Sequence, residues 1–95
     1  MIDKWSRWKA AIAAEKSGED PMEWVLRRST VDGETQWCKR CFMSGEVWVT
    51  LWIGDIAQAR HFGRQAVDFL AEYCTGQSGR HYLSAKWIAY EAVAA

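Results

Sequence analysis

Apolar residues near the start of the chain recur at three- and four-residue intervals. Trp5, Trp8, Ala11 and Ile12 fall on one side of a helical projection. Asp3 can cap the first turn, and Gly18 follows the pattern as a typical stop signal. The pattern therefore predicts an amphipathic helix over residues 3–17.

The segment after this helix supports two interpretations. Asp20 and Pro21 offer an N-cap and a proline at the first helical position, which favours a second helix. The apolar run from Trp24, however, leads directly into Asp32-Gly33, a strong signal for the turn of a β-hairpin. We favour a strand that begins at about Trp24, with a helix as the alternative.

Two further strands are predicted after this turn. Residues 35–43 read as the partner of the first strand, and residues 46–53 as a third strand across a turn at Ser44-Gly45. From Val47 to Ile53 this third strand is apolar on both faces except at Thr50, a pattern typical of central strands. We therefore expect a three-stranded antiparallel meander with a well-covered third strand.

The clearest helical pattern covers residues 55–74. Apolar residues recur there at helical spacing, and polar residues occupy the opposite side. Asp55 is placed to cap the first turn, Gln58 completes a pair resembling a capping box, and Gly76 supplies an exit. We expect one long helix over this segment.

The last segment, residues 80–93, alternates like a strand but also fits a helix, and we favour the strand. Together the elements predict one α+β domain spanning residues 1–95. In this domain the N-terminal helix and the three-stranded antiparallel meander pack against the long helix, and a C-terminal strand or helix closes the fold.

The composition is that of a folded chain, with 49% hydrophobic and 25% charged residues. Twelve Lys and Arg balance twelve Asp and Glu, and zero net charge removes general attraction to nucleic acids and anionic membranes. Apolar runs are far shorter than the roughly 18–20 residues of a membrane span, and the first residues lack the apolar core of a signal peptide. Three is an odd number of cysteines, which argues against a complete set of disulfides and favours a reducing compartment. We therefore expect a cytoplasmic protein without a membrane segment.

Cys38 and Cys41 have the two-residue spacing of a zinc knuckle or a redox dithiol. A zinc site needs four ligands, and the remaining candidates, Cys74, His61 and His81, match no zinc module in their spacing. On a strand, residues three apart point to opposite faces, so the two thiols are predicted to diverge, one inside and one outside. We expect no metal, no cofactor and no enzymatic activity, with a redox or metal role for this pair as the exception.

A small basic patch is predicted on the polar side of the long helix, from Arg60, His61 and Arg64. Such a patch fits a phosphate or an acidic protein surface. Asp68 lies one turn after Arg64 and can pair with it, which favours the alternative of an ordinary solvated helix face.

Seven tryptophans are too many for a small core, so we expect at least one exposed indole that contributes to a protein-binding surface. Trp37, Lys39 and Arg40 are the candidates on the second strand. With Arg27 and Arg28 the same residues support an alternative, a small nucleic-acid-binding module in which Trp37 stacks on bases.

A tryptophan-rich stretch at residues 48–55, followed by Ala-Arg-His-Phe at residues 59–62, resembles a pattern in small phage and prophage α+β proteins. In size and in its lack of catalytic motifs the chain is also similar to anti-CRISPR proteins and other small inhibitors of bacterial defence. This resemblance implies a stoichiometric inhibitor that binds a host protein or protein complex in the bacterial cytoplasm. Self-association through the same aromatic surface is an alternative.

Overall fold

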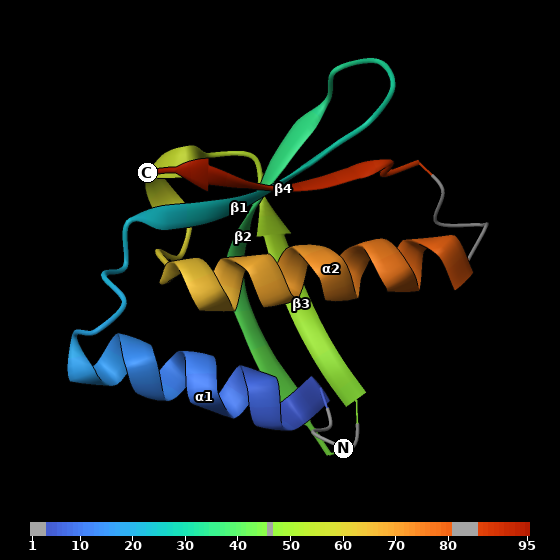
Figure 1. Ribbon diagram of the computed structural model, residues 1–95. Coiled ribbons are helices and arrows are strands. Elements are labelled where there is room, and N and C mark those ends of the chain that lie inside the picture. The colour runs from blue at the N-terminus through green and yellow to red at the C-terminus, as the bar shows by residue number, and fades with distance from the viewer. Residues whose placement is uncertain (1–3, 46, 81–85) are drawn as a thin grey trace.

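The computed structural model describes residues 4–45, 47–80 and 86–95 (Figure 1). Two helices, a short 3₁₀ turn and a four-stranded antiparallel sheet form an α+β fold. Along the chain the elements are α1 (Lys4–Ser17), β1 (Trp24–Ser29), β2 (Thr35–Ser44), β3 (Val47–Ile53), η1 (Ile56–Gln58), α2 (Arg64–Arg80) and β4 (Ala89–Ala94).

The N-terminal helix and the three-stranded meander are confirmed. β1 is a strand, as favoured over the helical alternative, and its hairpin with β2 turns at Asp32-Gly33, where Gly33 adopts a φ of +89°. The turn is closed by a backbone hydrogen bond from Thr30 N–H to Glu34 O at 3.0 Å. A positive φ strains any residue with a Cβ, so glycine at this position fixes the hairpin.

The strand order is β3-β2-β1-β4, and this corrects the predicted central position of β3. β4 pairs with β1 rather than with β3, so β3 is an edge strand. β3 is apolar on both faces for a reason other than a central position in the sheet. Trp48 and Trp52 pack against the core, while the alternate residues of β3 form part of an apolar surface on the opposite face.

Both helices cover one face of the sheet. The buried core joins Ala11 of α1, Leu26 of β1, Cys38 of β2 and Leu70 of α2, each at most 1% exposed. Figure 1 shows α1 and α2 lying side by side across the strands. The sheet therefore has a helix-covered inner face and an outer face on which neither helix lies.

An aromatic cluster extends this core toward the start of α1. The indole of Trp48 in β3 lies 5.4 Å from Trp5 and 5.1 Å from Trp8, measured between ring centroids, and Phe69 and Tyr73 of α2 complete the cluster. All seven tryptophans of the chain are half-buried. The expectation of an exposed indole is therefore wrong as to exposure, since five of the rings pack against the core and none is fully exposed, whereas the contribution of an indole to a protein-binding surface stays a prediction.

The helix predicted from residue 55 begins only at Arg64. Asp55 does cap a helical turn, accepting a hydrogen bond from Ala57 N–H at 2.9 Å, but that turn is the short η1. The chain then becomes extended, and Phe62 exchanges two backbone hydrogen bonds with Trp24, at 3.0 and 2.7 Å. This bridge holds residues 59–63 out of the helix although their apolar spacing matches its period.

α2 also runs past Gly76, the predicted exit, to Arg80. Gly76 lies inside the helix, and no atom lies within 4 Å of the position that its Cβ would take. The predicted C-terminal strand is confirmed as β4 over Ala89–Ala94, whereas Arg80, the first residue of the predicted segment, belongs to α2. Residues 81–85, which fall in the segment predicted as strand, lie outside the described residues. No helix in the described parts of the chain is long and apolar enough to cross a bilayer.

Two acidic side chains distant in sequence hold the start of α2. Asp20 accepts hydrogen bonds from the backbone N–H groups of Arg64, at 2.9 Å, and Gln65, at 2.8 Å. Glu15, whose side chain is 4% exposed, accepts from Gly63 N–H at 2.8 Å. The unpaired N–H groups and the positive dipole at a helix N-terminus favour such carboxylates, so both residues stabilise this junction.

Gly63 is expected to tolerate no side chain. A Cβ there would lie 2.7 Å from Asp20 Cγ and 3.0 Å from Asp20 O, which forces the capping segment away. We expect Gly63→Ala to lower the free energy of unfolding by about 2 kcal/mol. Gly76→Ala, inside α2, is the matched control, and we expect it to raise stability by roughly 0.5–1 kcal/mol. Urea denaturation of both variants measures the difference, and equal effects would contradict the packing described.

Candidate protein-binding surface

The outer face of the sheet carries a continuous set of apolar side chains. β2 and β3 are paired so that Trp37 lies opposite Ile53, and Phe42 lies opposite Val49. Leu51 lies between the two β3 residues on the same face and is 43% exposed, whereas the other four are half-buried. We call these five residues, Trp37, Phe42, Val49, Leu51 and Ile53, the outer patch.

Two basic residues lie beside the outer patch. Lys39 and Arg40 are exposed at an irregularity of β2, where the register with β3 shifts between Cys38 and Arg40. The Arg40 guanidinium lies 4.9 Å from the centroid of the Phe42 ring, a cation–π distance. Three of the predicted partner-binding residues, Trp37, Lys39 and Arg40, therefore lie together on β2, next to the exposed apolar side chains of the outer patch.

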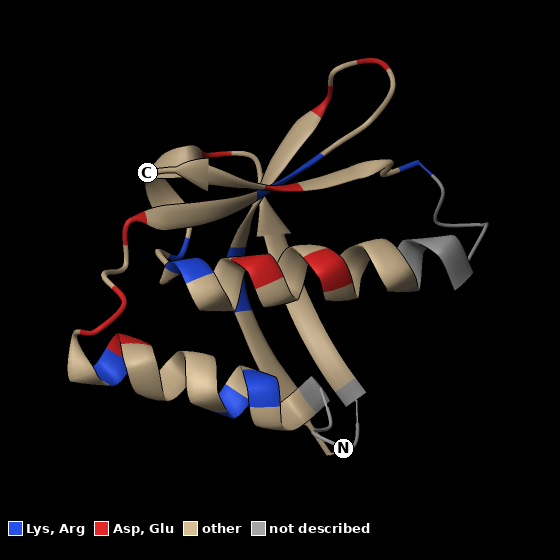
Figure 2. Ribbon diagram, viewed as in Figure 1, with Lys and Arg blue, Asp and Glu red and all other residues tan. Residues whose placement is uncertain are grey.

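β3 adds an open strand edge to this surface. β2 pairs with one side of β3, and in the described sheet no strand pairs with the other side. The seven residues of β3 include no charged residue and no proline, the two features that usually block pairing with a foreign strand. Figure 2 shows the charged residues on the helices, the loops and the other strands. The backbone groups along this edge are therefore able to pair with an extended segment of another chain.

The opposite edge of the sheet differs in charge. β4 carries Glu91, which forms a 3.0 Å salt bridge with Arg27 on the neighbouring strand β1. Charged side chains on an edge strand oppose pairing with a second apolar strand. β3 is therefore the edge better suited to a partner.

Arg28 does not join the basic residues of the outer face. Its guanidinium lies between two indoles, 4.3 Å from the Trp52 ring centroid and 4.1 Å from the Trp87 ring centroid, and it donates to Gln36. Burial lowers the pKa of Arg28 from its ordinary value. Arg28 thus points to the inner face, and the predicted nucleic-acid-binding set of residues is divided between the two faces of the sheet.

The predicted basic patch of Arg60, His61 and Arg64 does not lie on one helix. Arg60 and His61 precede α2 rather than lying on it. The Arg60 guanidinium forms a 3.0 Å salt bridge with the buried Glu15 and covers the Phe62 ring, which gives it a structural role. His61 is exposed in the same segment.

Arg64, the first residue of α2, pairs with Asp68 one turn later at 3.0 Å, both side chains being largely exposed. Its guanidinium also lies 4.3 Å from the Trp24 ring centroid. The alternative weighed for this helix, a solvated face with an internal salt bridge, is therefore confirmed for Arg64.

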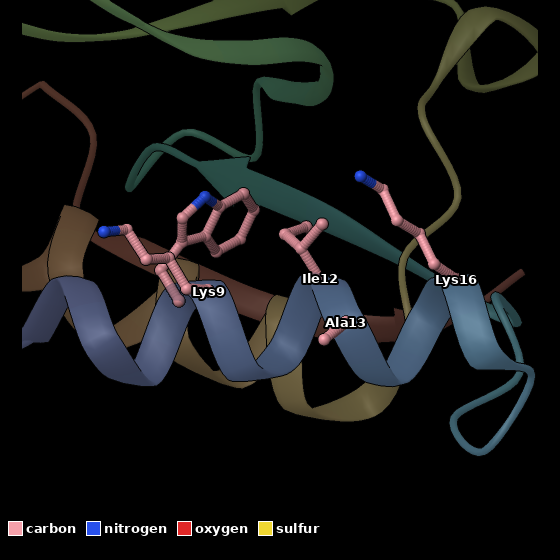
Figure 3. Close-up of a pocket in the computed structure, with 5 residues that line it drawn as sticks. Lys9, Ile12, Ala13 and Lys16 are labelled. Atoms are coloured by element: carbon pink, nitrogen blue, oxygen red, sulfur yellow. The ribbon is translucent and has the colours of Figure 1, made fainter.

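A shallow hollow of about 300 Å³ lies on α1 (Figure 3). Trp8, Ile12 and Ala13 line its apolar part, and Lys9 and Lys16 flank it. All five residues come from one helix, so the hollow is a depression in a helix surface rather than a cleft between elements.

The predicted divergence of Cys38 and Cys41 is wrong. Cys38 lies opposite Trp52 and Cys41 opposite Thr50, two residues that point to the same face of β3. One extra residue of β2 is accommodated between them as a β-bulge, so both thiols point to the inner face and interact with each other, and the Cys38 thiol donates to the backbone carbonyl of Arg40 at 3.7 Å. Among the described residues, no three His, Cys, Asp or Glu side chains are grouped so that they could hold a metal ion.

No protein-family model matches the chain, and neither the curated proteins nor the solved structures gave a match.

Proposed function

We propose that the chain is a non-enzymatic module that binds another protein through the open edge of β3 and the adjoining outer patch. The observation that carries this proposal is the placement of β3, an uncharged edge strand whose outward side chains join exposed apolar area. Long apolar edge strands are normally blocked in monomeric proteins, so an open one favours a partner strand.

The chemistry beside the edge favours a particular kind of partner. Lys39 and Arg40 add two positive charges next to Phe42 and Leu51. An extended segment that places apolar side chains on the outer patch and acidic side chains near the β-bulge would complement both features. We therefore propose an acidic, extended segment of a protein as the ligand.

The resemblance to small phage inhibitors suggests what such a segment belongs to. We propose a host protein complex in the bacterial cytoplasm, which the chain would inhibit by occupying a strand edge needed for assembly. A binder of this kind needs no catalytic group, because inhibition follows from occlusion at fixed stoichiometry.

Affinity capture tests this function. The immobilised chain, incubated with lysate of the cells that encode it, is expected to retain a protein or complex at constant stoichiometry in quantitative mass spectrometry. Sedimentation of the chain alone separates this outcome from self-association through β3. Retention of nothing above a blank-resin control would contradict the proposal, and a stable homodimer would replace the foreign partner with a second copy.

The nucleic-acid alternative keeps one supporting observation, the proximity of Trp37 and Phe42 to Lys39 and Arg40 on one face. Net charge is zero, however, and the guanidinium of Arg28 is stacked between Trp52 and Trp87 on the inner face. We expect no binding to single-stranded oligonucleotides in fluorescence anisotropy at physiological salt. Binding that weakens steeply as salt is raised would favour the alternative instead.

A further inference from the structure

The β-bulge brings two thiols within reach of a covalent bond. Cys38 and Cys41 lie opposite Trp52 and Thr50, which are two residues apart on the regular strand β3. A two-residue step along a strand spans about 6.6 Å. The bulge thus brings the Cα atoms of the two cysteines, which are three residues apart, to about this separation. It lies at the upper end of the Cα separations of about 4.4–6.8 Å found in disulfides.

The two thiols differ in exposure. Cys38 is 0% exposed and belongs to the buried core, whereas Cys41 is half-buried and packs at the border of that core. Cys41 is therefore the more accessible of the two thiols to a dissolved reagent. This arrangement, an accessible thiol in contact with a shielded one, is typical of an attacking and a resolving cysteine.

The surroundings of Cys41 favour its thiolate. A hydrogen bond from the Cys38 thiol lowers the pKa of Cys41, and the guanidinium of Arg60 lowers it further, while burial and the Glu15 carboxylate act in the opposite direction. The hydrogen bond to Cys41 and burial raise the pKa of Cys38. Since the thiolate is the nucleophile, Cys41 is the thiol that reacts first.

A third thiol provides an internal comparison. Cys74 of α2 is 8% exposed in the same core, and burial raises its pKa to about 12. It is protonated at neutral pH and shielded from solvent, so it should remain unreactive.

We propose that Cys38 and Cys41 form a redox modification site, at which a small-molecule disulfide oxidises the pair to an intramolecular disulfide that thiols reduce again. The proposal is independent of the protein-binding function, because it rests on the bulge and on the two thiols alone.

The reaction balances as two thiol–disulfide exchanges. The Cys41 thiolate attacks one sulfur of the small disulfide, whose S–S bond breaks and releases one thiolate, and a mixed disulfide forms on Cys41. Cys38 then gives its proton to the released thiolate and attacks the Cys41 sulfur, which frees the second small thiolate; this thiolate takes up from the solvent the proton that Cys41 lost on ionisation. The protein loses two hydrogen atoms, and the small disulfide is reduced to two thiols.

Oxidised glutathione is a suitable probe, and intact-protein and peptide mass spectrometry under non-reducing conditions is the readout. We expect the folded wild-type chain to lose two hydrogen masses and to yield a Cys38–Cys41 cross-linked peptide, and Cys74→Ser to behave identically. Cys38→Ser is expected to accumulate one glutathione on Cys41. Cys41→Ser is expected to react at least tenfold more slowly than wild type. Circular dichroism before and after treatment verifies that each variant is folded.

Three results would overturn the proposal: a folded wild-type chain with all thiols free, a disulfide that includes Cys74, or Cys41→Ser modified on Cys38 as fast as wild type. If a serine variant fails to fold, the position of the cross-link in the wild-type chain and in Cys74→Ser decides the question.

Discussion

Replacing Glu15 by alanine is expected to lower the free energy of unfolding by about 3 kcal/mol, the largest loss of stability from any single polar side chain described here. The Glu15 carboxylate joins three parts of the fold: α1, the Gly63 N–H before α2 and the Arg60 guanidinium. Its removal leaves a buried N–H group without an acceptor and an arginine without its counter-ion. Because the Arg60 side chain is 32% exposed, water compensates part of this loss.

Urea denaturation followed by circular dichroism measures this change. Glu19→Ala is the matched control, since Glu19 is exposed and donates only its backbone N–H to a neighbouring serine. We expect that variant to lie within about 0.5 kcal/mol of wild type. Similar midpoints for Glu15→Ala and Glu19→Ala would show that the buried carboxylate does not hold the start of α2.

The second large effect concerns binding. Leu51→Lys places a charge in the middle of the outer patch and on the open edge, where lysine typically blocks strand pairing. Because Leu51 is 43% exposed, we expect stability to change by less than about 0.5 kcal/mol. Capture of the partner from lysate should fall by about tenfold or more, as for the loss of a residue at the centre of an interface.

Val31→Lys controls for the added charge and for the loss of an apolar side chain. Val31 is 81% exposed near the turn of the β1–β2 hairpin, which projects away from the rest of the sheet (Figure 1). We expect this variant to capture the partner as wild type does. Equal capture by Leu51→Lys and wild type would remove β3 from the binding surface.

The local elements could be predicted because their signals are local. The spacing of Trp5 and Trp8 gave α1, and Asp32-Gly33 between two apolar runs gave the β1–β2 hairpin. The start of α2 could not be predicted in this way. Phe62 has helical spacing with the apolar residues that follow it, and only its bridge to Trp24, far away in sequence, holds the segment extended.

The candidate surface was partly predictable. Trp37, Lys39 and Arg40 were singled out from the sequence and do lie together on β2. Phe42 and Leu51 were missed, because assigning them to the outer face requires the register beyond the bulge. The two-sided hydrophobicity of β3 is a usable signal, but by itself it predicts a central strand, since the pairing of β4 with β1 leaves no trace in the sequence.

Amide hydrogen exchange of the chain, alone and saturated with the captured partner, tests the central claim most directly. We expect the backbone amides of β3, and those of β2 beside the outer patch, to exchange more slowly in the complex. The amides of α1 and α2 should change little. Protection confined to the two helices, with β3 exchanging as it does in the free chain, would contradict binding through the open edge.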